Sequence, residues 1–285
     1  MRYKIIHKTQ YAFSKPVFLE PHLLRFRPQV TPFHTVEEFH LEISPKPSGH
    51  RQQRDAENNL IDSCWFDGVH DAFSICVGSI VDVAAHNPFD FILYPGTALQ
   101  LPFSYSLEQE KVLQPALQGA AIGDELRQYG QSVLKKAQAN TTVFLTQLTQ
   151  QIQQDFTAIY REVGEPFSPD HTFAGREGSC RDLTWMMIQL LRDFGLAARF
   201  VSGYNYIITD EEPSFELHAW VEVFLPGAGW VGYDPTHGIV VGTAHIPVAA
   251  SSIYENTMPV SGNLRGDASA KLFTDLQIEL LTDFS

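Results

Sequence analysis

Alternating apolar and polar positions dominate the first third of the chain and predict β-structure there. Five segments carry β-branched and aromatic residues in partial alternation, a pattern typical of half-buried strands: residues 3–13, 19–28, 35–43, 60–66 and 73–83. Turn-forming stretches at 45–49 and 55–59 separate some of them. Several short strands in succession indicate an antiparallel, sandwich-like domain.

A helical period replaces this alternation further along the chain. Apolar residues recur at three- and four-residue steps over 126–137 and 144–156, and Asn140-Thr141 provides a break and an N-cap between the two helices. A third helix is predicted over 180–194, where Gly195 is placed to cap its end. A short helix over 107–117 is also predicted, within a Pro-rich connection.

Strands follow the third helix at 198–206, 217–225 and 229–233, and residues 270–281 predict a final strand. The pattern therefore predicts an α+β fold in two domains. Residues 1–118 form the β-rich domain, and residues 119–285 form a core of helices and an antiparallel sheet that includes the C-terminal strand.

Cys180 stands three residues before the apolar stripe of the third helix and on the same face, so its thiol is expected to face the protein. The stripe consists of Leu183, Met186, Met187, Leu190, Leu191 and Phe194. At a helix N-terminus the unpaired N–H groups and the helix dipole favour the thiolate. Cys180 is then either a small packing residue or a nucleophile.

The residues around Cys180 predict a helix cap. Ser179 fits the N-cap of a capping box in which Asp182 reaches back, so Asp182 is interpreted as structural. Gly175 and Gly178 would let the preceding loop bring backbone N–H groups close to a substrate oxygen. We therefore expect an oxyanion hole that includes the N–H of Cys180.

The predicted strand at 217–225 alternates strictly between two faces, and one face carries a histidine. Leu217, Ala219, Val221, Val223 and Leu225 form one face, which is expected to be core. The other face carries His218, Trp220, Glu222 and Phe224, a mixture typical of the wall of a site. Alone, His218 is more often a surface or satisfied core histidine.

The turn after this strand decides whether Asp234 reaches His218. If residue 225 pairs with residue 230, Asp234 faces away from His218; if it pairs with Gly229, Asp234 falls opposite Trp220 and diagonal to His218. The turn residues 226–229 are mostly small or bend-forming, which makes the second register plausible. A Cys–His–Asp triad requires that register.

Metal binding is an alternative interpretation of the same residues. Cys180, His218, Asp234 and His237 could be ligands, but the closely spaced pairs typical of zinc sites are absent from the sequence. We therefore predict no metal and no cofactor.

These motifs resemble the bacterial transglutaminase-like family, within the papain-like cysteine protease superfamily. The resemblance rests on residues 178–182, 198–204, 218–223 and 229–236, and residues 3–16 and 55–59 resemble the β-rich domain that precedes the core in that family. It implies a papain-like core in which Cys180 is the nucleophile, His218 the general base and then acid, and Asp234 the orienter of the imidazole. Supporting or substrate-binding roles are expected for Gly178, Ser179, Tyr204, Trp220 and Glu222.

The chain departs from the family pattern in three places. His237 stands where Asn commonly follows Asp-Pro-Thr, Ser251-Ser252-Ile253 replaces a Gly-Arg-Asp before Tyr254, and Asn58 occupies a position where a turn glycine is usual. These departures leave the triad intact and bear on substrate preference.

The net charge of the chain excludes some classes of binding partner. A net charge of −13 over 285 residues argues against nucleic acid or an anionic membrane surface. The first 14 residues lack the apolar core of a signal peptide, and no run approaches the roughly 18 apolar residues of a membrane helix. Cys64 and Cys76 flank a predicted hairpin and are expected to be reduced thiols. These features predict a cytoplasmic location.

The expected activity is acyl transfer through a thioester on peptide or carboxamide bonds, most simply by a protease or amidase acting on a peptide or protein. A true transglutaminase with an amine acceptor, a non-catalytic binding module and a zinc hydrolase are the alternatives. The sequence gives no prediction of oligomeric state.

Overall fold

The N-terminal alternation forms long antiparallel strands. In the computed structural model, which describes residues 1–161, 163–208 and 213–281, β1 (Arg2–Leu19) pairs with β6 (His70–Val83), and β6 pairs with β3 (His34–Ser44). A second sheet has the order β14 (Val260–Ser261), β2 (His22–Leu24), β5 (Leu60–Trp65) and β4 (Gly49–Arg54). Apolar side chains of both sheets share one core, as expected for a sandwich-like domain.

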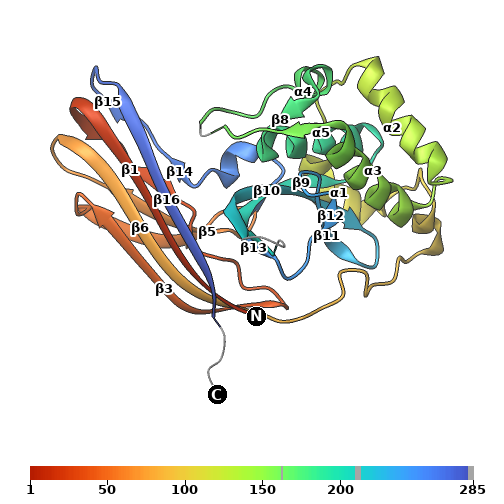
Figure 1. The fold of residues 1–285 in the computed structure, drawn as a ribbon, viewed down its shortest axis with the longest axis horizontal. Coiled ribbons are helices and arrows are strands. Elements are labelled where there is room, and N and C mark those ends of the chain that lie inside the picture. The colour runs from red at the N-terminus through yellow and green to blue at the C-terminus, as the bar shows by residue number, and fades with distance from the viewer. Residues whose placement is uncertain (162, 209–212, 282–285) are drawn as a thin grey trace.

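The C-terminal strand completes the β domain. β16 (Ala270–Leu281) runs antiparallel along β1, and β15 (Leu264–Arg265) pairs with the far end of β1. Figure 1 shows β16 lying beside β1 although the two are at opposite ends of the chain. The expected inclusion of this strand in the core domain is therefore wrong, because its backbone hydrogen bonds are with β1. Residues 282–285, the end of the expected core domain, lie outside the described residues.

The core domain also begins before residue 119. The 3₁₀-helix η1 (Gly96–Leu99) places Ala98 in the main core, and α1 (Leu107–Leu117) packs Leu113 and Ala116 against Ala197. Tyr105 fixes this segment, because its hydroxyl donates a 2.9 Å hydrogen bond to the carbonyl oxygen of Phe224. The boundary therefore lies in the connection after β6.

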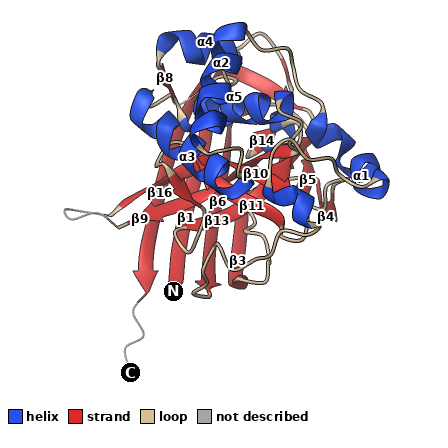
Figure 2. Ribbon diagram, turned by 90° about the vertical axis from the view of Figure 1, so that its right-hand side faces the viewer, coloured by secondary structure: helices blue, strands red, loops and turns tan. Residues whose placement is uncertain are grey.

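Helices cover one side of the core sheet (Figure 2). They are α2 (Asp124–Lys136), α3 (Thr141–Asp155), α4 (Pro169–Gly175) and α5 (Cys180–Asp193), and Asn140 caps α3 as the sequence predicts. The apolar stripe of α5 is buried against the sheet. Within the described part of the chain, no helix is both long and apolar enough to cross a membrane.

The core sheet is antiparallel and has the order β12 (Ile239–Val240), β11 (Gly229–Asp234), β10 (Ser214–Leu225), β9 (Ala198–Ile207) and β13 (His245–Ser251). Two short strands, β7 (Thr157–Ala158) and β8 (Glu177–Gly178), pair beside the start of α5, and η2 (Tyr254–Thr257) follows β13. The observed elements confirm the α+β class.

The β10–β11 hairpin adopts the register that a triad requires. Leu225 pairs with Gly229 and Val221 pairs with Tyr233, so the loop has an odd number of residues. Asp234 consequently falls on the face of the sheet that carries His218. Gly227 and Gly229 both have positive φ angles, +89° and +78°, which residues with a Cβ rarely adopt.

Gly227→Ala should destabilise the protein by about 2 kcal/mol or more, because the left-handed backbone is strained by a Cβ and the new methyl group meets the carbonyl oxygen of Ile92 at 2.4 Å. Urea unfolding measures the effect. Gly96→Ala is the matched control, since a Cβ there meets nothing within 4 Å. Equal unfolding midpoints for the two variants would contradict this account of the hairpin.

Candidate active site

Cys180 is the first residue of α5 and lines a cleft of about 540 Å³. As the first helical residue, it has a backbone N–H without an intrahelical acceptor, which suits an oxyanion-binding role. The side chain is partly exposed and also packs against the main core. All three cysteines are free thiols, as the sequence predicts for Cys64 and Cys76.

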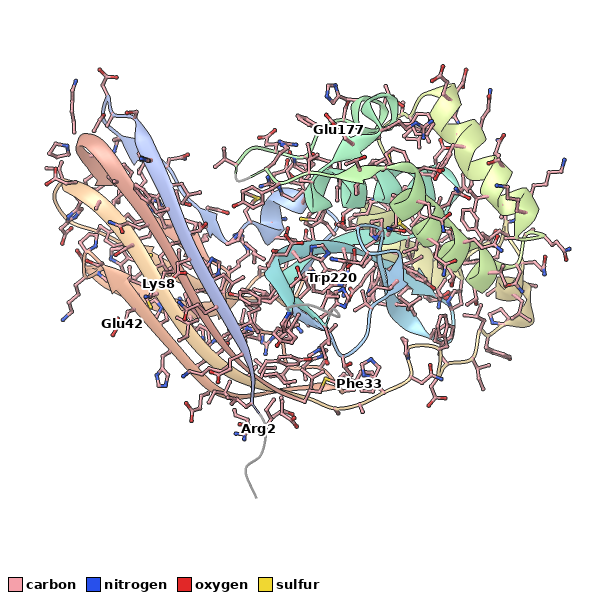
Figure 3. The ribbon with its side chains drawn as sticks, in the orientation of Figure 1. Arg2, Lys8, Phe33, Glu42, Glu177 and Trp220 are labelled. Carbon is pink, nitrogen blue, oxygen red and sulfur yellow. The ribbon has the colours of Figure 1, made fainter. Side chains whose placement is uncertain are left out.

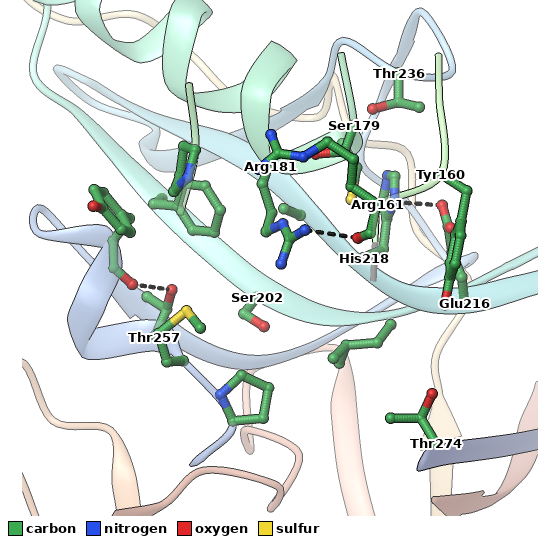
Figure 4. A pocket seen from close by; sticks show the side chains of 18 of the residues that line it. Tyr160, Arg161, Ser179, Arg181, Ser202, Glu216, His218, Thr236, Thr257 and Thr274 are labelled. Carbon is green, nitrogen blue, oxygen red and sulfur yellow. Dashed lines mark hydrogen bonds and ion pairs between the residues drawn. The ribbon is translucent and has the colours of Figure 1, made fainter. Parts of the chain in front are cut away.

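The cleft lies between the two domains. Ser202 and His218 line it from the core sheet, and Tyr160 and Arg161 line it from the segment between α3 and α4. Its opposite wall belongs to the β domain and consists of His7, Thr274 and Leu276, with residues 257–259 between the two walls. Figure 4 shows Thr274 across the open space from His218. The β domain is thus part of the site and not only an attachment to it.

Asp182 anchors the start of α5. Its buried carboxylate accepts hydrogen bonds from the N–H and hydroxyl of Ser179 at 2.7 and 2.6 Å, from the N–H of Phe167 at 2.7 Å and from Arg161 at 2.6 and 2.7 Å. Burial alone would raise the pKa of Asp182, but these hydrogen bonds lower it. The structure confirms the capping box and shows that it also holds the loop that carries Arg161.

Gly178 is required by this packing. A Cβ at Gly178 would meet the Cβ of Asp182 at 2.8 Å, so a side chain there would displace the cap. Gly178 itself does not line the cleft, whereas Ser179 does. The carbonyl oxygen of Gly178 accepts a 3.0 Å hydrogen bond from the N–H of Ile159. The glycine therefore brings the cleft segment close to α5.

His218 links the thiol to Asp234. Its Nε2 lies 2.9 Å from Oδ2 of Asp234, and both side chains are fully buried. On the other side of the ring, Sγ of Cys180, a carboxylate oxygen of Glu216 and a ring nitrogen of His218 lie within 4.8 Å of one another. The structure thus brings together the three residues that the sequence analysis selected.

Asp234 binds two further histidines. Oδ2 also contacts Nδ1 of His237 at 2.8 Å and Nε2 of His245 at 2.9 Å, while Oδ1 accepts the N–H of Thr236 at 2.9 Å and of His237 at 3.3 Å. Three imidazoles therefore converge on one carboxylate oxygen. From the sequence, His237 was considered as a metal ligand and as a departure from the family pattern that bears on substrate preference. His245 was not identified, because it comes from β13 and has no local signal.

The charge states follow from these contacts. Burial alone would lower the pKa of His218, but Asp234, Cys180 and Glu216 together raise it well above its usual value. Burial alone would raise the pKa of Asp234, but His218, His237 and His245 hold it well below its usual value. Burial lowers the pKa of His245, so this residue is neutral and donates its Nε2–H to Asp234. The favoured state is a His218 imidazolium beside an Asp234 carboxylate.

Glu216 is a cleft residue that the sequence analysis did not identify. Its Oε1 lies 2.8 Å from Nδ1 of His218. Figure 4 draws Glu216 beside His218. Yet Nδ1 has no hydrogen-bond partner among the described residues, so the carboxylate lies beside the ring and off the N–H direction. A signal existed in the sequence: Glu216 is two residues before His218, which places both on one face of a strand.

Three further predicted residues, Tyr204, Trp220 and Glu222, lie behind or beside the cleft and do not line it. Trp220 is buried, with its ring centroid 6.4 Å from that of His218, and lies inside the molecule in Figure 3. The hydroxyl of Tyr204 lies 3.1 Å from Nδ1 of His7, which joins the core to the β domain. The carboxylate of Glu222 binds Arg199 at 2.7 Å and is not available to a substrate.

Among the described residues, two groups of side chains have the donors for a metal ion: Cys180, Glu216 and His218, and His218, Asp234 and His245. In the second group the histidine nitrogens already lie at hydrogen-bond distance from Asp234. Those side chains would have to reorganise before an ion could bind between them. The geometry therefore fits a hydrogen-bonded triad better than a metal centre.

Comparisons with known proteins show which families the chain resembles. Residues 3–82 match the model of the bacterial transglutaminase-like N-terminal region, and residues 127–235 match that of the transglutaminase-like superfamily. An uncharacterised protein of Mycobacterium tuberculosis is 29% identical over 287 residues, which cover 92% of this chain and 87% of the relative. The protein-glutamine gamma-glutamyltransferase of Pseudomonas aeruginosa is 30% identical over 131 residues, which cover 42% of this chain and 18% of that enzyme.

Among solved structures, a proposed cysteine protease from Cytophaga hutchinsonii has a TM-score of 0.68 and 18% identity, covering 100% of this chain and 92% of that protein. The likeness extends over both domains and shows that the fold is shared. The thiol at the N-terminus of α5 faces an imidazole on the antiparallel core sheet, as in a papain-like core. The chain is similar to the transglutaminase-like superfamily over residues 127–235 and to the bacterial transglutaminase-like N-terminal region over residues 3–82.

Asp234→Asn should lower the free energy of unfolding most below about pH 6.5. The raised pKa of His218 adds stability that is fully present below the unfolded value of 6.5 and is lost as pH rises through the folded value. The difference between parent and variant should therefore shrink from pH 6 to pH 9 in chemical unfolding. Asp193→Asn, which changes a more exposed carboxylate, should show a nearly constant difference. A difference that grows with pH would contradict the assigned charge states.

Asp182→Ala should destabilise the protein by roughly 1–3 kcal/mol, because buried donors lose their acceptor. It should also weaken the attachment of the segment that carries Arg161, which limited proteolysis would detect. Asp193→Ala on the same helix removes the carboxylate of the more exposed pair with Arg127 and should have a smaller effect. Equal loss of stability in the two variants would refute the anchoring role.

Proposed function

We propose that the protein is a cysteine-dependent acyl-transfer enzyme that hydrolyses peptide or carboxamide bonds. One observation carries the proposal: His218 contacts Asp234 through Nε2 while a thiol lies within 4.8 Å of the ring. A packing cysteine has no need of a buried imidazole that is itself oriented by a buried carboxylate. This arrangement is the one that activates a thiol nucleophile.

The reaction begins with attack of the Cys180 thiolate on the substrate carbonyl carbon. The tetrahedral oxyanion is stabilised by the N–H of Cys180 and the N-terminal end of α5. The imidazolium of His218 then donates its Nδ1 proton to the departing nitrogen, the C–N bond breaks, and an amine leaves a thioester on Cys180. Neutral His218 next accepts a proton from water as the water attacks the thioester carbon. The C–S bond then breaks, a carboxylic acid is released, and the Cys180 thiolate and the His218 imidazolium are restored.

Asp234 keeps His218 in the productive state throughout. The hydrogen bond to Nε2 fixes the ring so that Nδ1 faces the thiol, and the carboxylate stabilises the imidazolium that each half-reaction requires. His245 and His237 hold Asp234 in turn, since each contacts Oδ2. We therefore assign His237 the role of holding Asp234 in place of the metal-ligand role considered from the sequence.

Transfer to an amine is the alternative outcome of the same thioester. The identity between the core of this chain and the Pseudomonas aeruginosa protein-glutamine gamma-glutamyltransferase supports it. The likeness over both domains to the proposed cysteine protease supports a shared fold and leaves the acceptor open. We favour hydrolysis of a peptide or protein substrate. The cytoplasmic location and the lack of nucleic-acid and membrane partners stay predictions.

Cys180 should react with iodoacetamide at neutral pH faster than the other cysteines, as followed by peptide mass spectrometry. Cys64 is buried, and burial raises its pKa to about 12, so it should stay unmodified in the folded protein. His218→Ala should slow the modification of Cys180.

Cys180→Ala should lower amidase activity on a peptide library by about a thousandfold or more, whereas Cys76→Ala should retain it. An active Cys180→Ala protein would disprove the proposal, and a parent without activity or selective alkylation would favour a binding module.

A further inference from the structure

Glu216 is an acidic residue in the cleft that does not belong to the triad. It lies on β10 and its side chain is 42% exposed, so one side of the carboxylate is open to the cleft. The backbone N–H of Glu216 donates a 3.0 Å hydrogen bond to the side-chain oxygen of buried Asn205. The backbone of Glu216 is therefore fixed on the sheet, so the carboxylate extends from a strand and not from a free loop.

The proton transfers identify the side of the cleft on which Glu216 lies. In the proposed reaction the departing amine takes its proton from Nδ1 of His218, so the amine nitrogen has to lie within hydrogen-bond distance of that atom. Oε1 of Glu216 is 2.8 Å from the same nitrogen. The carboxylate therefore borders the amine side of the scissile bond, next to the position of the leaving group.

Glu216 has little positive charge around it apart from His218. The ion pair found for Glu216 among the described residues is the one with His218. Of the cleft arginines, Arg161 binds Asp182, and Arg181 donates to the carbonyl oxygen of Arg161 at 2.7 Å. Figure 4 shows Arg181 and Glu216 on opposite sides of His218. Once His218 gives its proton to the leaving group, Glu216 loses its positive neighbour.

We propose that Glu216 binds a positively charged group on the amine portion of the substrate, such as the side chain of a lysine or arginine that follows the scissile bond. This inference rests on the proposed acyl-transfer function. The substrate cation replaces the charge that His218 loses at proton transfer, so its attraction to Glu216 is greatest when the amine departs. An acidic side chain at that position meets a like charge and is disfavoured.

The amine site can be probed without knowing the natural substrate, because an amine that attacks the thioester occupies the place of the leaving amine. The intact protein is acylated with the p-nitrophenyl ester of benzyloxycarbonyl-glycine, and release of nitrophenol together with a mass adduct on Cys180 reports the acyl-enzyme. The thioester is then partitioned between water and one of three amines: 1,5-diaminopentane, pentylamine or 5-aminopentanoate. These amines share a chain length and carry a distal cation, no charge or a distal anion.

We expect 1,5-diaminopentane to capture the acyl group roughly tenfold more efficiently than pentylamine, after correction for the free-amine fraction, and 5-aminopentanoate to be the poorest acceptor. Glu216→Gln should bring the three amines to within about twofold of each other, and Glu216→Asp should keep the order. Glu177→Gln is the matched control, because it removes an equal charge from an exposed position that does not line the cleft (Figure 3). It should keep the parent preference.

The outcomes separate the two proposals. If no acyl-enzyme forms on Cys180, the proposed function fails and this inference falls with it. If the acyl-enzyme forms but the parent does not discriminate among the amines, or Glu216→Gln keeps the parent order, the function stands and the inference is overturned. If Glu216→Gln slows acylation, hydrolysis and all three aminolyses by the same factor, Glu216 only positions His218 and the inference is likewise overturned.

Discussion

The buried carboxylate of Asp234 is the group on which the rest of the site depends. One oxygen receives three imidazole nitrogens, from β10, from the turn after β11 and from β13, and the other receives two backbone N–H groups. A buried charge is tolerated only when it is paired and hydrogen-bonded. The three segments are therefore held in one arrangement, and the same contacts keep His218 charged and turned toward Cys180.

A second buried carboxylate, that of Asp182, likewise holds separate segments together through hydrogen bonds. It joins the first turn of α5 to the segment that carries Arg161. The β domain supplies the remaining wall through His7, Thr274 and Leu276. The thiol, the imidazole and the substrate cleft are consequently set by contacts among three parts of the chain. The role of the β domain, which the sequence left open, includes shaping the space in front of Cys180.

Local patterns predicted most of the elements. The helix at α1 and the strand at β16 fall at the expected residues, and the third helix begins at Cys180 as expected. The errors have a common cause. β16 was assigned to the wrong domain because alternation does not reveal the partner of a strand. β4 (Gly49–Arg54) was not predicted as a strand, since its polar residues carry no apolar alternation and its pairing with β5 alone makes it a strand.

The sequence by itself determined the chemistry: a thiol at a helix start, a histidine on an alternating strand and an aspartate after a glycine-rich turn. Each depends on local periodicity and cap or turn preferences, which neighbouring residues decide. Only the tertiary structure decided that the hairpin pairs Leu225 with Gly229 and that His245 joins Asp234. These are contacts across the sheet register and between distant strands. The contact of His245 with Asp234 gains its energy from pairing buried polar groups on separate strands, so no local pattern encodes it.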